Sequence, residues 1–193
     1  MPFGPEIFEA HLRRLLDPTH TQRISDEEHF ERFWQLREHL VIRAREAAMK
    51  HARSWRNFVV GCAVFAYDSK RTADWQLGTR WKVFTGCNFK PFEGGHNVCA
   101  EQIAIGAAVN EGYERIIGMA LAGEPQPDGQ TGLKAKTLYP CGNCRAFFQA
   151  LPQVRPDTVI ISTTLEETGS IEVYTVEELL KLHNEPKTGQ TNQ

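Results

Sequence analysis

Apolar residues in the first third of the chain recur at steps of three and four, which is typical of amphipathic helices. A short helix is predicted over residues 5–16, and Asp17-Pro18 ends it. A second helix is predicted to begin at Ser25-Asp26-Glu27-Glu28, which has the form of a capping box. Ile42 and Met49 interrupt the polar face of this second helix, which indicates a second contact there. Its apolar stripe consists of Phe33, Leu36, Leu40, Ala44 and Ala47.

Continuous apolar runs replace the helical period after the second helix, and they predict buried strands. Helices are predicted between these runs, over residues 99–109 and 141–151, and a last helix begins at Thr175-Val176-Glu177-Glu178, another capping-box form. Because strands alternate with helices, the sequence predicts a layered α/β domain. The predicted strands cover residues 58–67, 81–85, 115–122, 158–163 and 171–174.

The chain divides into one long domain and two short ends. With 193 residues and 41% apolar content, it can bury one sizeable core. We expect a helical extension at residues 1–27, the main domain at 28–183 and a disordered polar tail at 184–193. The stretch 123–138 contains several proline and glycine residues, and it is predicted to be an exposed connection and a candidate lid.

Charge and composition narrow the classes of partner and location. A formal net charge of -2 gives no reason to expect attraction to a polyanion, so a nucleic-acid partner is not expected. The one basic stretch, residues 50–56, is interpreted as a solvated helix end. No apolar run reaches the roughly 18 residues of a membrane span, and the N-terminus lacks a signal-peptide pattern. We therefore expect a cytoplasmic protein without a membrane partner, whose five cysteines serve a metal or catalysis rather than disulfides.

Three cysteines carry the chemistry that the sequence indicates. Cys141 and Cys144 lie at the predicted start of a helix, where both thiols project from one face and the helix dipole favours thiolates. Cys99 opens another predicted helix and is the best third ligand. Cys62 or Cys87 could close a four-cysteine site, but both lie at apolar strand runs, as core cysteines do. With three protein ligands, a zinc ion keeps a position for water, as catalytic sites do.

Glu101 follows Cys99 by two residues, so its carboxylate can stand beside the metal without binding it. The order Cys-Ala-Glu followed by Pro-Cys-x-x-Cys is a variant of the zinc deaminase signature. A closed structural site has no use for such a glutamate, and the prediction is therefore a water-activating centre. We further hypothesise that Arg145, directly after Cys144, donates to a thiolate and compensates the negative charge of the three sulfurs.

With these motifs the chain resembles the cytidine deaminase family in its small homotetrameric form, from about residue 40 to residue 182. The resemblance implies a three-layer α/β/α sandwich around a central mixed five-stranded sheet. It also implies one Zn²⁺ per subunit and a homotetramer whose sites neighbouring chains complete, with a homodimer as the alternative. It is carried by Phe58-Val59-Val60-Gly61-Cys62-Ala63, Thr85-Gly86-Cys87-Asn88, Cys99-Ala100-Glu101, Pro140-Cys141-Gly142-Asn143-Cys144-Arg145 and Thr175-Val176-Glu177-Glu178-Leu179-Leu180.

The resemblance also implies the roles of individual residues. It makes Glu101 the catalytic proton carrier. For Phe58 the alternative is plain strand core, for Asn88 the cap of a turn, and for Lys90 a solvated loop lysine. The implied zinc ligands are Cys99, Cys141 and Cys144, and the implied substrate-binding residues are Phe58, Asn88, Lys90 and Ala100.

Two departures from the family pattern concern the substrate and the thiolates. The family's loop reads Asn-x-Glu, whereas Asn88 is followed here by Lys90 in the glutamate position. A lysine cannot accept a hydrogen bond from a hydroxyl, and it suits an anionic or acceptor-rich group instead. Gln102 stands where the family has an arginine that touches the thiolates. Blasticidin S deaminases, a related group, lack both features and share a Phe-x-Gly-Gly that is similar to Phe92-Glu93-Gly94-Gly95.

The sequence therefore predicts an enzyme that acts on a small nucleoside. The predicted reaction is zinc-dependent hydrolytic deamination of cytidine, deoxycytidine or a closely related cytosine nucleoside to the uracil form, with release of ammonia, as in pyrimidine salvage. Two alternatives stay open. One is a deaminase of a cytosine-containing antibiotic or modified nucleoside, and the other is a zinc-binding protein of this fold without activity.

Overall fold

A computed structural model describes residues 27–71, 80–93, 95–126 and 135–184 of the chain. None of the helices in these ranges is long and apolar enough to cross a membrane. The predicted helix over 5–16 lies outside the described residues, as do nearly all of the predicted extension and tail. The elements follow one another as α2 (Glu27–Gln35), α3 (Arg37–His51), β1 (Arg53–Ser54), β2 (Val60–Tyr67), β3 (Trp81–Cys87), β4 (Phe89–Lys90), α4 (Ala100–Asn110), β5 (Arg115–Gly123), α5 (Gly142–Ala150), β6 (Val154–Thr163), β7 (Ile171–Thr175) and α6 (Val176–Asn184).

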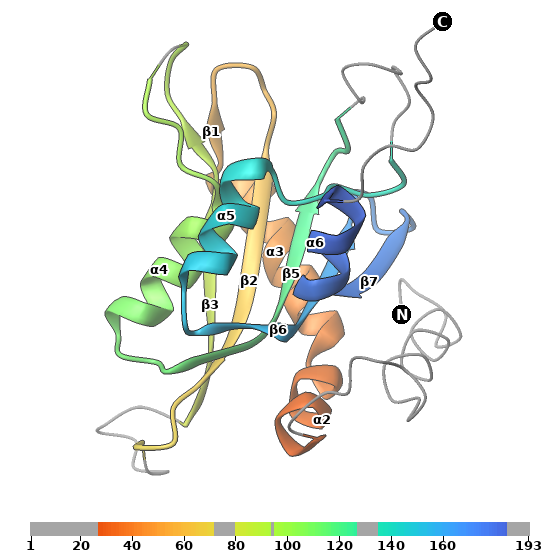
Figure 1. Cartoon of the computed structure of the whole chain (residues 1–193). Helices are drawn as coiled ribbons and strands as arrows, with labels where there is room; N and C mark the ends of the chain where they lie inside the picture. Colours follow the sequence, from red (N-terminus) through yellow and green to blue (C-terminus); the bar gives the residue numbers. More distant parts are fainter. Residues whose placement is uncertain (1–26, 72–79, 94, 127–134, 185–193) are drawn as a thin grey trace, which may run out of the picture.

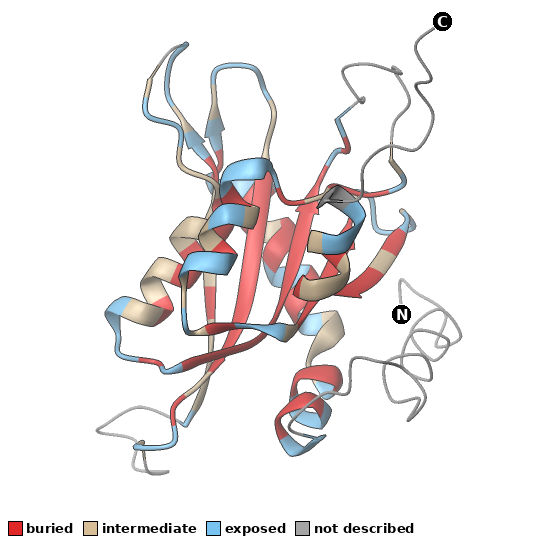
Figure 2. Cartoon of the chain, in the orientation of Figure 1, coloured by how far each residue is buried: buried red, intermediate tan, exposed pale blue. Residues whose placement is uncertain are grey.

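The main sheet has five strands in the order β3-β2-β5-β6-β7. Strands β5 and β6 run parallel, and the other neighbouring pairs are antiparallel, so the sheet is mixed. Strands β2 and β5 occupy the interior of the sheet and are buried along almost their whole length (Figure 2). Burial on both faces explains why these segments have continuous apolar runs in the sequence.

Helices cover both faces of the sheet, with α2 and α3 on one side and α4, α5 and α6 on the other (Figure 1). Each face has its own apolar core. Phe33 and Leu40 belong to the core under α2 and α3. Ile105, Phe148 and Leu179 belong to the core under α4, α5 and α6. The predicted three-layer α/β/α sandwich with a mixed five-stranded sheet is therefore confirmed.

Two glycines allow helices to approach the sheet closely. A Cβ atom at Gly61 would collide with the backbone of Ala44 in α3. A Cβ atom at Gly86 would lie 2.5 Å from the carbonyl oxygen of Ala100 in α4. Helix α4 therefore packs directly on the backbone of β3, and this contact fixes the position of its first turn.

The predicted single helix after Ser25 divides at Leu36 into α2 and α3. The amide of Leu36 donates to the carbonyl oxygen of Phe33 at 3.0 Å, so the chain tightens into a 3₁₀-type turn there. Phe33 still faces the core, and the rest of the stripe is buried or partly buried. Ile42 and Met49 are 47% and 71% exposed, and the second contact predicted for them stays a prediction.

A second, two-stranded sheet joins the segment after β3 to the segment after α3, and neither of its short strands was predicted from the sequence. Strand β4 pairs in parallel with β1, with Phe89 opposite Arg53 and Lys90 opposite Ser54. Phe89 also bridges to Val98, directly before the start of α4. This small sheet, to which Lys90 belongs, lies near the end of the main sheet where α4 begins (Figure 1).

Candidate active site

The N-termini of α4 and α5 bring three cysteines together. Cys99 is the N-cap residue of α4 and Cys141 the N-cap residue of α5, and both have the extended backbone that this position requires. Cys144 lies in the first turn of α5 and is buried. The sulfurs of Cys99 and Cys141 are 3.6 Å apart, and all three sulfurs lie within 4.8 Å of one another.

This cluster fits a zinc ion. A tetrahedral centre with Zn–S bonds of 2.3 Å places two sulfurs about 3.8 Å apart, close to the observed separation. Three thiolates are the protein share of a catalytic site, in which a water or substrate takes the fourth position. Within the described ranges, the three cysteines are the group of His, Cys, Asp and Glu side chains that could hold a metal ion.

Hydrogen bonds among the three sulfurs give the three thiols different pKa values. The hydrogen bond with Cys144 lowers the pKa of Cys141 well below that of a free thiol. The hydrogen bond with Cys141 raises the pKa of both Cys99 and Cys144. Cys141 is therefore the first of the three to hold a thiolate, and metal binding must displace the protons of the other two.

Glu101 lies on the first turn of α4 and is only 4% exposed. Burial raises the pKa of its carboxyl, and a hydrogen bond with its own backbone and the positive charge of Lys90 act in the opposite direction. A hydrogen bond with the Cys144 side chain also lowers the pKa of this carboxyl. The structure thus places a carboxyl that holds its proton more tightly than usual directly beside the sulfur cluster.

Two cavities adjoin the cluster. The inner one has a volume of about 60 Å³, and Cys99, Glu101 and Cys141 line it. The outer one has a volume of about 420 Å³, which is within the range of small-molecule sites. The two cavities share walls made by Phe58, Lys90, Leu138, Tyr139 and Cys141.

Comparison with known proteins decides the family. A family model described as the cytidine and deoxycytidylate deaminase zinc-binding region matches residues 35–163, which is more than half of the chain. The chain belongs to this family. The three-cysteine cluster is its zinc site, with one ion per chain.

Curated relatives and solved structures agree with this assignment. A "Probable cytidine deaminase" of Dictyostelium discoideum is 38% identical over 66 residues, which cover 34% of this chain and 40% of that protein. The blasticidin-S deaminase of Bacillus cereus is 28% identical over 101 residues, which cover 52% of this chain and 67% of that protein. The crystal structure of a cytidine deaminase from Burkholderia pseudomallei has a TM-score of 0.56 and 26% identity, and covers 74% of this chain and 94% of that one. The match to the Dictyostelium protein spans well under two thirds of its length.

Two of the four residues predicted to bind substrate in this deaminase-family chain line both cavities. Phe58 and Lys90 are half-buried, and the Nζ atom of Lys90 lies 5.3 Å from the centre of the Phe58 ring. Ala100 is fully buried, and it lines the inner cavity but not the outer one. Their contact with a substrate stays a prediction.

Asn88 lines the inner cavity, but backbone groups use both ends of its amide. Its Oδ1 atom accepts from the amide of Val60 at 2.8 Å, and its Nδ2 atom donates to the carbonyl oxygen of Phe58 at 2.7 Å. These bonds fix the turn into β2, as the alternative interpretation of Asn88 expects. One N–H and one lone pair of the amide remain for a substrate, so the predicted binding role stays open.

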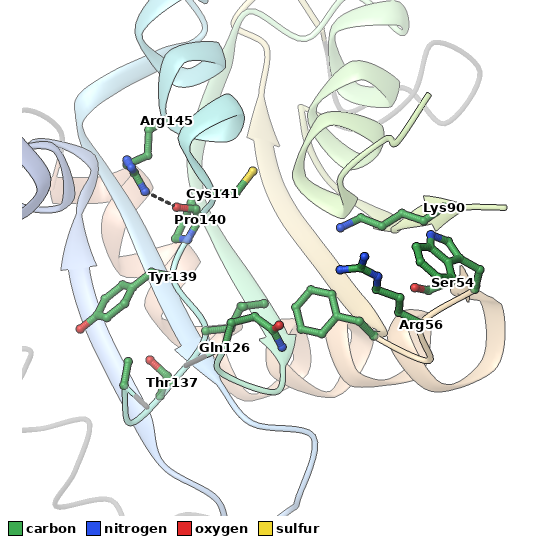
Figure 3. Close-up of a pocket in the computed structure, with 13 residues that line it drawn as sticks. Ser54, Arg56, Lys90, Gln126, Thr137, Tyr139, Pro140, Cys141 and Arg145 are labelled. Atoms are coloured by element: carbon green, nitrogen blue, oxygen red, sulfur yellow. Dashed lines mark hydrogen bonds between the residues drawn. The ribbon is translucent and has the colours of Figure 1, made fainter. Parts of the chain in front are cut away.

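Arg145 lies at the outer cavity, where its Nη1 atom donates to the carbonyl oxygen of Pro140 at 2.8 Å (Figure 3). Among the described residues, this carbonyl is its hydrogen-bond acceptor, and the predicted compensation of thiolate charge stays a prediction. Gln102 has a definite local role, because its side chain accepts from the amide of Cys99 at 3.4 Å in a capping box. A glutamine three residues after the N-cap is the sequence signal for this bond.

Hydrogen bonds that are not evident from the sequence hold the segment before Cys141 in place. Both carboxylate oxygens of Glu172 in β7 are used, since Thr137 donates to one at 2.5 Å and Tyr139 donates to the other at 3.2 Å. Between them, the carbonyl oxygen of Leu138 accepts from the hydroxyl of Ser162 in β6. The wall shared by the two cavities is thus tied to the sheet at consecutive residues.

Proposed function

We propose that this chain catalyses hydrolytic deamination of a cytosine nucleoside, such as cytidine or deoxycytidine, to the uracil form. One observation carries the proposal. A deeply buried carboxyl, Glu101, lines the same small cavity as Cys99 and Cys141. A purely structural zinc site would gain nothing from a carboxyl that is costly to bury in this position.

The chain's own groups then divide the work. When bound by the three thiolates, zinc supplies Lewis acidity that lowers the pKa of water to near neutrality. Glu101 accepts a proton from the attacking water and donates it to the ring nitrogen, and it then carries the remaining proton of the newly attached hydroxyl group to the departing amine. A C–O bond forms at the carbon that loses its amino group, the C–N bond breaks, and ammonia leaves. A carboxyl with a raised pKa suits both directions of transfer at neutral pH.

The cavities set the orientation of the substrate. The inner cavity admits only the amino end of a pyrimidine, because its volume is about 60 Å³. The Phe58 ring, which lines both cavities, forms part of the wall against which the base lies. The outer cavity takes the rest of the molecule.

A second candidate is a deaminase of a cytosine-containing antibiotic or a modified nucleoside. The match to blasticidin-S deaminase extends over 52% of this chain, more than the match to the Dictyostelium cytidine deaminase. Lys90 also favours a substrate with more acceptor groups than a plain ribose has. Activity against blasticidin S, cytidine, deoxycytidine, cytosine and 5-substituted cytidines, followed by loss of the aminopyrimidine absorbance, separates the candidates.

Replacement of Glu101 with glutamine tests the reaction. We expect Glu101→Gln to retain about one zinc per chain and the native fold, because the sulfurs are untouched. Its kcat/KM falls by about 10³-fold or more, since no other carboxyl lines the inner cavity among the described residues. The matched control is Glu111→Gln at the other end of the same helix, where the carboxyl is exposed. Near-normal turnover in Glu101→Gln would refute the mechanism, and zinc without activity in the wild type would favour the inactive alternative.

We also propose that the chain assembles as a homotetramer or homodimer. The exposed side chains of Ile42 and Met49, on the outer side of α3, support a contact between copies of the chain. Light scattering of the purified protein measures the assembly. A monomer at micromolar concentration would contradict this part of the proposal.

A further inference from the structure

The outer cavity has a strongly one-sided charge. Lys90 in β4 and Arg56, just after β1, line this cavity, and Figure 3 shows their charged ends directed into it, across from Cys141. Arg145 is the third basic residue of the lining. Among the described lining residues there is no aspartate or glutamate.

Lys90 has no ion-pair partner among the described residues, although its positive charge acts at longer range on the carboxyl of Glu101 in the inner cavity. Its Nζ atom lies 5.3 Å from the centre of the Phe58 ring, and no described group forms an ion pair or hydrogen bond with it. An aromatic ring at this distance replaces only part of the hydration that a half-buried ammonium loses. The ammonium group is therefore available to a charged ligand in the cavity.

Arg56 has a weak partner that an incoming anion can replace. Its Nη2 atom lies 3.6 Å from Oε1 of Glu93, and the two side chains are 69% and 74% exposed. Exposed ion pairs of this kind contribute little. Because Lys90 and Arg56 direct like charges into one cavity, a bound anion also relieves their repulsion.

We propose that the substrate carries an anionic oxygen group, a phosphate or a carboxylate, and that Lys90 and Arg56 bind this group in the outer cavity. This rests on the proposed function, which places the aminopyrimidine end in the inner cavity beside Glu101. A guanidinium fork and an ammonium are the side chains that bind such groups best. The outer cavity of about 420 Å³ has room for a sugar and its anionic substituent.

Three substrates that differ only at the 5′ position test this assignment. Cytidine, cytidine 5′-monophosphate and cytidine 5′-carboxylate are compared in the wild-type holoenzyme, Lys90→Gln and Arg56→Gln. We expect the wild type to have a kcat/KM about tenfold or more higher for at least one anionic compound than for cytidine. The preferred compound then identifies the anionic group as a phosphate or a carboxylate.

In Lys90→Gln and in Arg56→Gln we expect the ratio of kcat/KM for the anionic compound to kcat/KM for cytidine to fall about tenfold. The ratio is the test because Lys90 also lines the inner cavity, so its loss can change turnover of all three compounds, whereas Arg56 lines the outer cavity only. Lys90→Glu goes further and reverses the preference, and added salt weakens the wild-type preference. The matched control is Lys82→Gln. It removes the same charge from a lysine that pairs with Glu111 at 2.7 Å and does not line either cavity.

The outcomes separate this proposal from the proposed reaction. If cytidine is the best wild-type substrate, or if Lys90→Gln lowers activity equally on all three compounds, the anion site is overturned. Calorimetry with the uracil counterparts decides the case in which no compound is deaminated. If the wild type binds an anionic uracil compound more tightly than uridine and Lys90→Gln loses this preference, the anion site is supported and only the proposed reaction is wrong. If all three uracil compounds bind equally, the anion site is overturned.

Discussion

Replacement of Gly86 with alanine tests whether the close contact between β3 and α4 sets the position of the metal centre. The new Cβ atom would lie 2.5 Å from the carbonyl oxygen of Ala100 and 2.6 Å from the amide nitrogen of Ala104. Ordinary van der Waals contact begins at 3.4 Å, so the helix must retreat by about 0.9 Å, the difference between 3.4 and 2.5 Å. Both neighbouring atoms are backbone, so no flexible side chain can absorb the clash.

The retreat acts on the first turn of α4, which carries Cys99 and Glu101. Overpacking of this kind typically costs about 1–3 kcal/mol, and we expect the free energy of unfolding of Gly86→Ala to fall by that amount. A displacement of about 1 Å in a reacting group costs about 10²-fold in rate. We therefore expect weaker zinc binding and a kcat/KM reduced about a hundredfold in the protein that remains folded.

Two other glycines provide controls. A Cβ atom at Gly106, on the same helix α4, meets nothing within 4 Å, so Gly106→Ala should raise the free energy of unfolding by up to about 1 kcal/mol and leave zinc affinity unchanged. Gly61→Ala overpacks β2 against α3, on the opposite face of the sheet from the cysteines. We expect Gly61→Ala to lose stability but to keep zinc affinity in its folded fraction.

The assays are urea denaturation of the holoprotein, zinc retention against a competing chelator, and kcat/KM on the best substrate. A destabilised Gly86→Ala protein with unchanged zinc retention and turnover would refute the reasoning, because the ligands would then be independent of the β3–α4 contact. Equal zinc loss in Gly61→Ala would refute it too, since the effect would then follow from general destabilisation.

Two hydrogen-bonded carboxylates give the remaining predictions. In Glu172→Gln the donors Thr137 and Tyr139 lose a charged acceptor, so we expect the free energy of unfolding to fall by about 1–3 kcal/mol. We also expect a competing chelator to remove zinc faster, and an unchanged release rate would contradict the view that these bonds hold the segment before Cys141. Hydrogen bonds from Ser69 lower the pKa of Glu114, which therefore stabilises the fold above its unfolded pKa and loses this effect as pH falls through its lower folded pKa. The Glu114→Gln variant should thus have a lower free energy of unfolding than the wild type near neutral pH, and the same free energy once the wild-type carboxyl is protonated. Urea denaturation of both proteins at the two pH values measures this, and the same difference in free energy at both would contradict it.

Secondary structure was predictable where burial imposes a pattern. Strands β2 and β5 are buried on both faces, so their sequences are continuous apolar runs that are recognised as buried strands. The capping box at the start of α6 is present as predicted, with Thr175 and Glu178 exchanging hydrogen bonds of 2.7 and 3.2 Å. The break at Leu36 was not predictable, because a leucine there fits the apolar stripe of a continuous helix.

The metal centre was predictable from the sequence because its parts are local. Cys99 and Cys141 each cap a helix, and both helices have recognisable starts. The bonds to Glu172 were not predictable, because they join residues 33 and 35 positions apart through the pairing of β6 and β7. The pairing of β1 and β4 was missed for another reason, since two-residue strands leave no periodic signal.

The residues of the metal centre and Lys90 are held by different parts of the fold. The cysteines and Glu101 stand on helix ends that pack on the main sheet, where the Gly86 contact and the Glu172 bonds restrain them. Lys90 stands on β4, which lies outside the main sheet, pairs with the two-residue strand β1 and is bridged through Phe89 to Val98. A change of the Lys90 side chain can therefore alter the walls of both cavities while the main-sheet contacts that restrain the zinc ligands stay in place.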